Sequence, residues 1–255
     1  MGSGARRSGA AALLLCGALA VAAGGCGSSS PDVGLIAPAV APVSPKHVSA
    51  RTQALRAGTL IAQVKRSTGV RDAPGGRVLA RISPQTEYHS PTILPVLRRR
   101  GAWYAVVTAA LPNNRVGWIS AHARLAFYTA DYRIDVSLRH RNVVVRHGQQ
   151  VIARFPVAIG APATPTPTGR YAITDKLFTH DQASPYGCCI LALSAHQPHI
   201  PQGWGGGDRI GLHATAHPET IGSAVSFGCL RAPQAEMRRL VAIVPLGTVV
   251  TIHAT

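Results

Sequence analysis

Apolar and polar residues alternate in short runs over most of the chain after residue 50, which predicts a mainly β protein. In residues 51–125 the pattern predicts strands at 59–65, 77–82, 103–107 and 116–119. Segments rich in Pro, Gly and Asn at 73–76 and 112–114 predict turns, whereas residues 86–100 show no clear period. These short strands are typical of a small all-β domain.

Longer strands are expected in a second domain, at residues 130–255. Apolar alternation and β-branched runs predict strands at 132–138, 142–146, 151–159, 171–174 and 247–253. Before the last strand, Met237, Leu240, Val241 and Val244 recur at helical spacing. They predict a short helix over 233–244, with Pro233 in its first turn.

The N-terminal residues have the pattern of an export signal. Two arginines, Arg6 and Arg7, precede an apolar run, and small residues then lead to Cys26. A cysteine at that point resembles a bacterial lipobox, so residues 1–25 are expected to be a lipoprotein signal peptide and Cys26 the lipidated residue. Cleavage after another small residue, or an uncleaved anchor, are the alternatives. Residues 26–50, rich in Pro, Ser and Ala, predict a flexible linker. The folded part is therefore expected outside the cell, lipid-anchored and facing the cell wall.

The chain is strongly basic, with 26 Lys and Arg residues against 10 Asp and Glu residues and a formal net charge of +16. Such an excess indicates an anionic partner. The arginines are scattered except at Arg98–Arg100, and no nucleic-acid-binding motif accompanies them. Together with the export signal, this favours anionic polymers of the cell envelope over nucleic acid.

Candidate chemistry is concentrated between Ile210 and Arg231. An imidazole at His213 can take the proton of the Cys229 thiol, and the thiolate is the nucleophilic form. Gly228 permits a turn that aims the amides of Phe227, Gly228 and Cys229 at an oxyanion, and Arg231 offers a charge for a carboxylate. The alternative is a buried structural thiol and a histidine that only packs in a strand.

The same residues resemble the signature of the L,D-transpeptidases, the YkuD-type domain. The resemblance rests on His213, Ile221-Gly222 and Ser226-Phe227-Gly228-Cys229-Leu230-Arg231. Many members have histidine where this chain has Phe227, and Gly-Thr where it has Ala214-Thr215. A second element, Thr-Pro-Thr-Gly-Arg-Tyr at 166–171, is similar to the Thr-Pro-x-Gly that precedes a strand in the family. The resemblance covers residues 131–252.

The resemblance implies a cysteine-dependent acyltransferase that needs no metal ion and no organic cofactor. Cys229 would form a thioester with a peptidoglycan tetrapeptide stem, His213 would carry the proton, and the Ala214 carbonyl would orient the imidazole. Residues expected to contact substrate are Arg231, Ser226, Trp204 and Tyr186. An amine of a second stem would resolve the thioester into a cross-link, and carbapenems would acylate Cys229. Trimming of the stem by water, and a non-catalytic wall-binding lipoprotein, are the alternatives; the oligomeric state is not indicated.

Residues 51–125 resemble a bacterial SH3-like domain, as in a lipoprotein of actinobacterial type. The resemblance rests on Trp103-Tyr104-Ala105-Val106 and on Gly117-Trp118-Ile119. The two tryptophans either line a groove for wall material or belong to the core.

Other cysteines and histidines allow further interpretations. Adjacent Cys188 and Cys189 either form a vicinal disulfide or leave one thiol free. The pairs His196/His199 and His213/His217, with Cys229, have spacings usable by zinc, so a zinc-dependent hydrolase is an alternative. We favour the interpretation that residues 196–204 form a loop over the active cleft, with Gln197, His199 and Trp204 near the substrate.

Overall fold

The computed structural model describes residues 58–179, 181, 184–200 and 207–255, and these residues belong to one compact unit. Cys26, the linker at 26–50 and Trp204 lie outside the described residues. The described part consists of two large sheets, a two-stranded sheet, a 3₁₀ helix and one α-helix. The prediction of a mainly β protein with a short helix near its C-terminus is confirmed.

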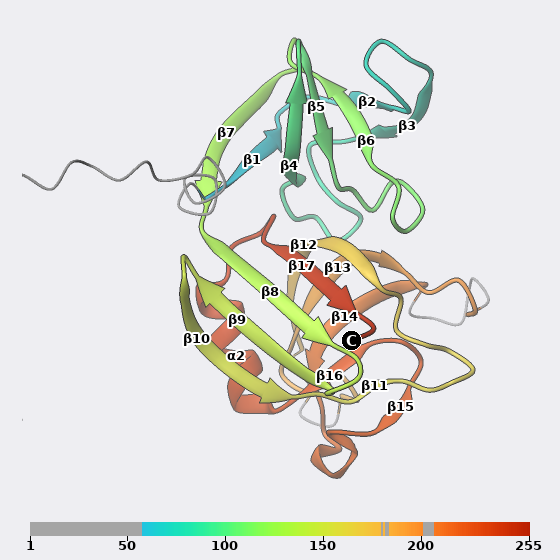
Figure 1. Ribbon diagram of the computed structural model, residues 1–255, viewed down its shortest axis with the longest axis vertical. Helices are drawn as coiled ribbons and strands as arrows, with labels where there is room; N and C mark the ends of the chain where they lie inside the picture. Colours follow the sequence, from blue (N-terminus) through green and yellow to red (C-terminus); the bar gives the residue numbers. More distant parts are fainter. Residues whose placement is uncertain (1–57, 180, 182–183, 201–206) are drawn as a thin grey trace, which may run out of the picture. The chain divides into compact units, whose positions relative to one another are not determined.

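The first sheet has seven strands (Figure 1). They are β1 (Thr59–Val64), β2 (Thr68–Arg71), β3 (Val78–Ile82), β4 (Ile93–Arg100), β5 (Trp103–Val106), β6 (Gly117–Ser120) and β7 (Leu125–Ala130). Their order in the sheet is β3-β2-β6-β5-β4-β1-β7, and all pairs are antiparallel. Strands β1, β3, β5 and β6 are those that the sequence pattern predicts.

The sequence pattern missed three strands of this sheet, β2, β4 and β7. In β4 the first residues are buried and the last three are exposed, so the strand shows no alternation. The turn at 73–76 joins β3 to β2, so the hairpin partner of β3 is β2 and not the strand at 59–65. Strand β7 reaches Ala130, beyond the predicted domain end at residue 125.

One side of the first sheet carries paired cations and aromatic rings. Arg98, Ala105, Trp118 and Arg71 are aligned across β4, β5, β6 and β2, so they share a face. The guanidinium of Arg98 lies 5.2 Å from the ring centre of Trp118, and that of Arg71 lies 5.7 Å from the ring of Trp103. We call Arg71, Arg98, Trp103 and Trp118 the cation face. Trp118 is buried and Trp103 is half-buried.

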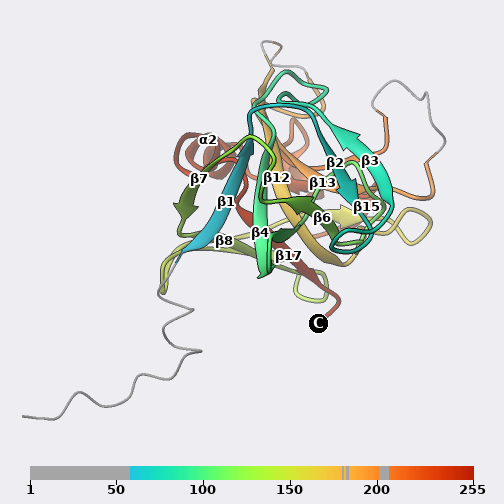
Figure 2. The same cartoon turned by 90° about the horizontal axis from the view of Figure 1, so that it is seen from above.

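The second sheet has eight strands (Figures 1 and 2). They are β8 (Tyr132–Ser137), β9 (Asn142–His147), β10 (Gln150–Pro156), β12 (Gly169–Phe178), β13 (Cys189–His196), β14 (Arg209–Ala214), β16 (Leu230–Ala232) and β17 (Val249–His253). Their order is β10-β9-β8-β17-β12-β13-β14-β16. The separate short pair is β11 (Ile159–Gly160) with β15 (Ala224–Ser226), and the 3₁₀ helix η1 spans Pro218–Thr220.

Helix α2 (Gln234–Ile243) follows β16 directly. Pro233 is its N-cap and not, as predicted, part of its first turn, because the ψ of Pro233 is 139° and therefore extended. Met237, Leu240 and Val241 are buried and belong to the same apolar cluster as Leu191 and Leu212 of the sheet. The helix therefore packs on the face of β13 and β14 that these leucines occupy. No helix in the described ranges is long and apolar enough to cross a membrane.

Candidate functional site

The register of three strands places core residues on one face of the second sheet and the candidate site residues on the other. Alternate residues of a strand point to opposite faces, and Leu191, Leu212 and Leu230, which lie in one row across β13, β14 and β16, enter the core. The neighbouring row is Ile190, His213 and Arg231, and it points to the other face. The strand geometry thus places His213 beside Arg231 without any help from sequence proximity.

Cys229 lies beside the same strands. It immediately precedes β16, two residues before Arg231, and the N–H of Gly211 on β14 donates to its sulfur. His213, Cys229 and Arg231 together line a cavity of about 380 Å³. The three residues that the sequence singled out for chemistry are thus brought together at one cavity.

His213 is buried and held by one backbone bond. Its Nδ1 lies 2.5 Å from the carbonyl oxygen of Ala214, and because a carbonyl only accepts, Nδ1 carries the proton. Nε2 then holds the free lone pair. Burial lowers the pKa of the imidazole to about 4; Arg231 lowers it further and the Ala214 bond opposes the shift. The carbonyl of Ala214 lies where the family resemblance expected it to be.

Cys229 is not part of a disulfide, and the residue is half-buried. The N–H of Gly211 donates to its sulfur over 3.3 Å, and the thiol points toward the carbonyl of Arg209 at 4.0 Å. Burial raises the pKa of the thiol, while the Gly211 N–H and the charge of Arg231 oppose that shift. Each pKa shift favours the neutral form of its own group, so both point to a neutral thiol and a neutral imidazole at rest.

The turn before Cys229 is built by Ser226 and Gly228. Gly228 has a φ of +113°, a conformation that favours glycine. The Ser226 hydroxyl donates to the Cys229 carbonyl over 2.6 Å and accepts from the Gly228 N–H over 3.1 Å. The Gly228 amide is therefore already bonded to a hydroxyl within the turn, and its role as an oxyanion donor stays a prediction. Ser226 is 2% exposed and its hydroxyl bonds backbone, so it shapes the turn.

Residues 164–166, which lead into the Thr-Pro-Thr-Gly-Arg-Tyr element, hold this turn in place through hydrogen bonds. The sequence did not indicate this role. Thr166, buried, donates to the Gly228 carbonyl and accepts from the Gly160 N–H, both over 2.8 Å. Thr164 donates to the carbonyl of Ser226 over 3.0 Å. Gln197 donates to the carbonyls of Pro165 and Phe227, both over 3.1 Å. The element thus fixes the backbone that leads to the cysteine.

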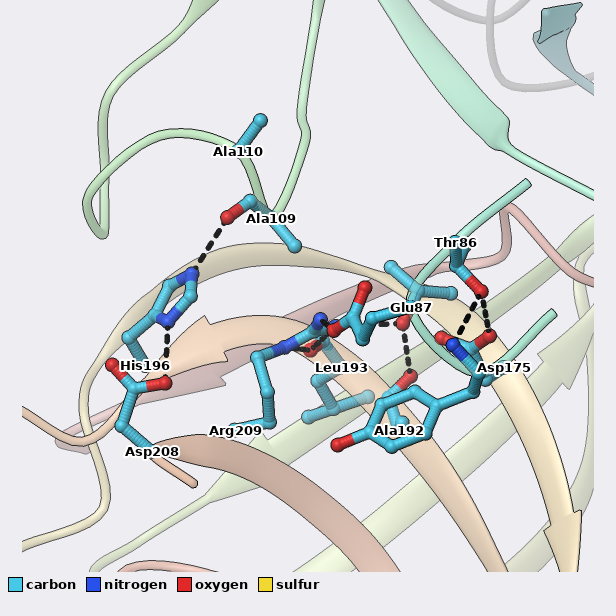
Figure 3. A network of polar contacts seen from close by, with 12 residues as sticks. Thr86, Glu87, Ala109, Ala110, Asp175, Ala192, Leu193, His196, Asp208 and Arg209 are labelled. Atoms are coloured by element: carbon cyan, nitrogen blue, oxygen red, sulfur yellow. Dashed lines mark hydrogen bonds and ion pairs between the residues drawn. The ribbon is translucent and has the colours of Figure 1, made fainter. Parts of the chain in front are cut away.

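Of the other residues that the sequence singled out, some line the cavity and one bonds elsewhere. Tyr186 lines the cavity and packs edge-on against His213, with ring centres 5.0 Å apart. Gln197 and Phe227 also line it, and the Phe227 side chain is 59% exposed. His196 instead bonds Asp208 and the carbonyl of Ala109 (Figure 3).

Two questions that the sequence left open concern cysteines and zinc. Cys188 and Cys189 form a disulfide. No group of three or more His, Cys, Asp or Glu side chains in the described part is arranged to hold a metal ion. His217, one member of the proposed zinc pairs, is exposed and pairs with Glu219.

Comparison with known proteins identifies the family. The YkuD family of L,D-transpeptidase catalytic domains matches residues 131–252. Two Bacillus proteins, both named "Putative L,D-transpeptidase YkuD", are 33% identical to this chain, one over 126 residues in Bacillus subtilis and one over 124 in Bacillus licheniformis. Each alignment covers 49% of this chain, and 68% and 67% of the relatives respectively. The chain belongs to the L,D-transpeptidase family.

Solved structures of L,D-transpeptidases resemble the chain more distantly. A mutant of the Enterococcus faecium enzyme is 16% identical, with a TM-score of 0.40, and the match covers 66% of this chain and 72% of that one. The L,D-transpeptidase domain of the present chain corresponds to the second sheet with α2, because the family match begins at residue 131 and β8 begins at Tyr132.

Proposed function

We propose that the chain is a peptidoglycan L,D-transpeptidase that uses Cys229 as its nucleophile and His213 as its proton carrier. The observation that carries the proposal is the strand register that sets Cys229, His213 and Arg231 on one cavity face. Membership of the family supports the reaction class, and the neutral imidazole with a free Nε2 supports the proton path.

In the first half-reaction the Cys229 sulfur attacks the carbonyl carbon between the L-centre of diaminopimelate and the terminal D-Ala of a tetrapeptide stem. Because both groups are neutral at rest, the thiol proton moves to Nε2 of His213 as the carbon–sulfur bond forms. The C–N bond then breaks, His213 returns the proton to the leaving D-Ala amine, and a thioester on Cys229 remains.

In the second half-reaction a side-chain amine of another stem attacks the thioester carbonyl. The amine gives its proton to His213, the carbon–sulfur bond breaks, and the sulfur takes the proton back. The product is an amide cross-link between two diaminopimelates. Attack by water would give a trimmed stem instead, so the acceptor decides between transpeptidase and carboxypeptidase. We assign Arg231 to a carboxylate of the stem and the Cys229 N–H to the developing oxyanion.

We also propose that lipidated Cys26 anchors the protein outside the cell and that the first sheet, as an SH3-like domain, contacts wall polymers. Between Thr59 and Ala130, ten Lys and Arg residues accompany two acidic residues, which supports an anionic partner. Replacement of Arg98, Arg99 and Arg100 by alanine in the full chain would weaken co-sedimentation with isolated cell walls; unchanged co-sedimentation would contradict this part.

Intact-mass measurement after exposure to a carbapenem tests the nucleophile. Wild type is expected to gain the mass of one drug molecule, and Cys229→Ala none. Circular dichroism of both proteins verifies the fold. Absence of an adduct on folded wild type would contradict an activated thiol at this site and favour the wall-binding alternative. After incubation with tetrapeptide muropeptides, the product masses distinguish cross-linked dimers, the transpeptidase product, from trimmed monomers, the carboxypeptidase product.

A further inference from the structure

One side chain at the cavity comes from the loop between two strands of the first sheet. Tyr88, in the β3–β4 connection, lines the same cavity as His213 and Cys229, although more than a hundred residues separate it from either. Its side chain is partly exposed, so the ring covers the cavity while keeping a surface toward solvent. The cavity is therefore composite, with its reactive groups on the second sheet and an aromatic side chain from the first.

An ion pair fixes this connection to the catalytic strand. Glu87 pairs with Arg209, the first residue of β14 (Figure 3). The Arg209 side chain is 9% exposed and also donates to the Leu193 carbonyl and, over 2.7 Å, to the Thr174 hydroxyl. Such bonds from a nearly buried guanidinium hold it in one orientation. Because the carbonyl of Arg209 faces the Cys229 sulfur, Glu87 is anchored at the strand that carries the chemistry.

A second anchor lies one residue before the ion pair. The Thr86 hydroxyl donates to Asp175, which is fully buried and lies level with Ala192, a residue that lines the cavity (Figure 3). The other carboxylate oxygen of Asp175 has no hydrogen-bond partner among the described residues. Loss of Thr86 would therefore leave a buried carboxylate without its bond, which is costly.

The same threonine also shapes the loop around Tyr88. Its hydroxyl oxygen accepts the N–H of Tyr88 over 3.3 Å and that of Ser90 over 3.2 Å. His89, between them, has a φ of +64°, a conformation that non-glycine residues adopt only in tight turns. The backbone on both sides of Tyr88 is thus fixed, and the ring is presented to the cavity with little conformational freedom to lose on binding.

The chemistry around Tyr88 fits a peptide. Burial raises the pKa of its phenol, with Glu87 and Asp175 adding to the effect and Arg209 opposing it, so the hydroxyl is neutral and can both donate and accept. Tyr186 and Leu177 line the cavity as well. Two aromatic rings and an aliphatic chain provide a surface for the methylene groups of a stem peptide, and the hydroxyl can bond its backbone.

We propose that Tyr88 is a specificity-determining residue of the transpeptidase, contacting the acyl-donor stem peptide bound at Cys229. The inference rests on the proposed function, because it requires a stem peptide in this cavity. It gives the first sheet a part in substrate selection, beyond any part in wall attachment. Thr86 and Glu87 are positioning residues, which act through Tyr88.

The test compares Tyr88→Ala with Tyr128→Ala in the full chain. Tyr128 is a matched control, since it is 38% exposed against 36% for Tyr88, lies on strand β7 of the sheet whose strands β3 and β4 the Tyr88 loop connects, and does not line the cavity. With a tetrapeptide stem as donor, Tyr88→Ala is expected to raise KM roughly tenfold or more, with a smaller change in kcat. Tyr128→Ala is expected to have the KM and kcat of wild type. Glu87→Gln is expected to raise KM by less than Tyr88→Ala does.

Alkylation of Cys229 by iodoacetamide provides a readout that needs no substrate recognition. Equal alkylation rates for wild type and Tyr88→Ala, with a higher KM for the variant, would support the contact. An unchanged KM in Tyr88→Ala would overturn it, as would a parallel fall in alkylation, turnover and thermal stability. Absence of turnover by wild type would instead contradict the proposed function, so the two failures are distinguishable.

Discussion

The cavity face of the second sheet and the cation face of the first sheet both present polar groups, but they hold them differently. In the second sheet His213 is buried, and its Nδ1 is bonded to a backbone carbonyl. In the first sheet Arg98 is exposed and lies over the ring of Trp118. The backbone hydrogen bond fixes the position and orientation of the His213 ring. The contact between the Arg98 guanidinium and the Trp118 ring is weaker, because water and salt screen the charge.

The comparison indicates at which positions a single substitution should impair function. A catalytic group needs exact placement, which strand register and backbone hydrogen bonds provide. A surface that attracts an anionic polymer needs only charge density, which any of several arginines can supply. We therefore expect large effects from single changes on the cavity face and small effects on the cation face.

The largest effect is expected from His213→Gln. The glutamine amide can still donate to the Ala214 carbonyl, but it cannot take the thiol proton, so acylation by a carbapenem should slow by roughly 10²- to 10⁴-fold. Stopped-flow or time-resolved mass measurement gives the rate. A rate within threefold of wild type would show that another group carries the proton.

The second prediction concerns pH and the free energy of unfolding. Because the pKa of His213 is about 4 in the folded protein against an ordinary 6.5, the unfolded chain takes up a proton at higher pH than the folded protein. Stability from this group is complete above pH 6.5 and falls as pH drops toward 4, by about 3 kcal/mol in total.

Urea unfolding of wild type and His213→Gln between pH 7 and pH 4 measures this contribution. The difference in their free energies of unfolding should change by about 3 kcal/mol across that range, since carboxylates titrate alike in both. Parallel curves would mean that His213 titrates normally.

The third prediction separates crowding from backbone strain in the turn before Cys229. A Cβ at Gly228 would lie 2.3 Å from Nε2 of Gln197 and 2.9 Å from Cδ1 of Ile210. Gly228→Ala should therefore displace Cys229 and slow acylation about 100-fold. Gly222→Ala is the control, because Gly222 also has a positive φ, +85°, yet a Cβ there meets nothing within 4 Å. Equal rates for both variants would refute a role for crowding.

The smallest effect is expected on the cation face. Arg98→Ala removes the guanidinium over Trp118 and should lower the free energy of unfolding by about 0.5–1 kcal/mol, with no change in carbapenem acylation. Arg100→Ala removes the same charge from the same strand and should lower the free energy of unfolding by less. A slower acylation in Arg98→Ala would show that the two faces are coupled.

Much of the second sheet was predictable because its signals are local. Alternation along β8 and the β-branched run in β9 predicted these strands, and the residues from Ser226 to Arg231 carry the cysteine turn within one short segment. The sequence also suggested the bond from His213 to the Ala214 carbonyl, because the two residues are adjacent. By contrast, β4 concentrates its buried residues at one end, which alternation cannot detect.

The remaining features of the site depend on long-range geometry. Tyr88 lies at the cavity beside Thr86 and Glu87, which bond Asp175 and Arg209, and no local pattern shows such pairs. The bond between the Gly228 N–H and the Ser226 hydroxyl depends on a turn whose geometry the residue types do not specify. The neutral resting pair likewise follows from burial, which the motif alone does not reveal.

The parallel pairing of β14 with β16 has an evolutionary consequence. Parallel neighbours cannot be joined by a tight turn, so the chain must leave the sheet between Ala214 and Leu230. It uses that excursion for η1 and for β15, which pairs with β11 outside the main sheet. Insertions or deletions near η1 would lengthen or shorten this excursion while the ladder keeps His213 aligned with Arg231. The alignment of His213 with Arg231 can therefore persist while the length of the segment between the two strands changes during evolution.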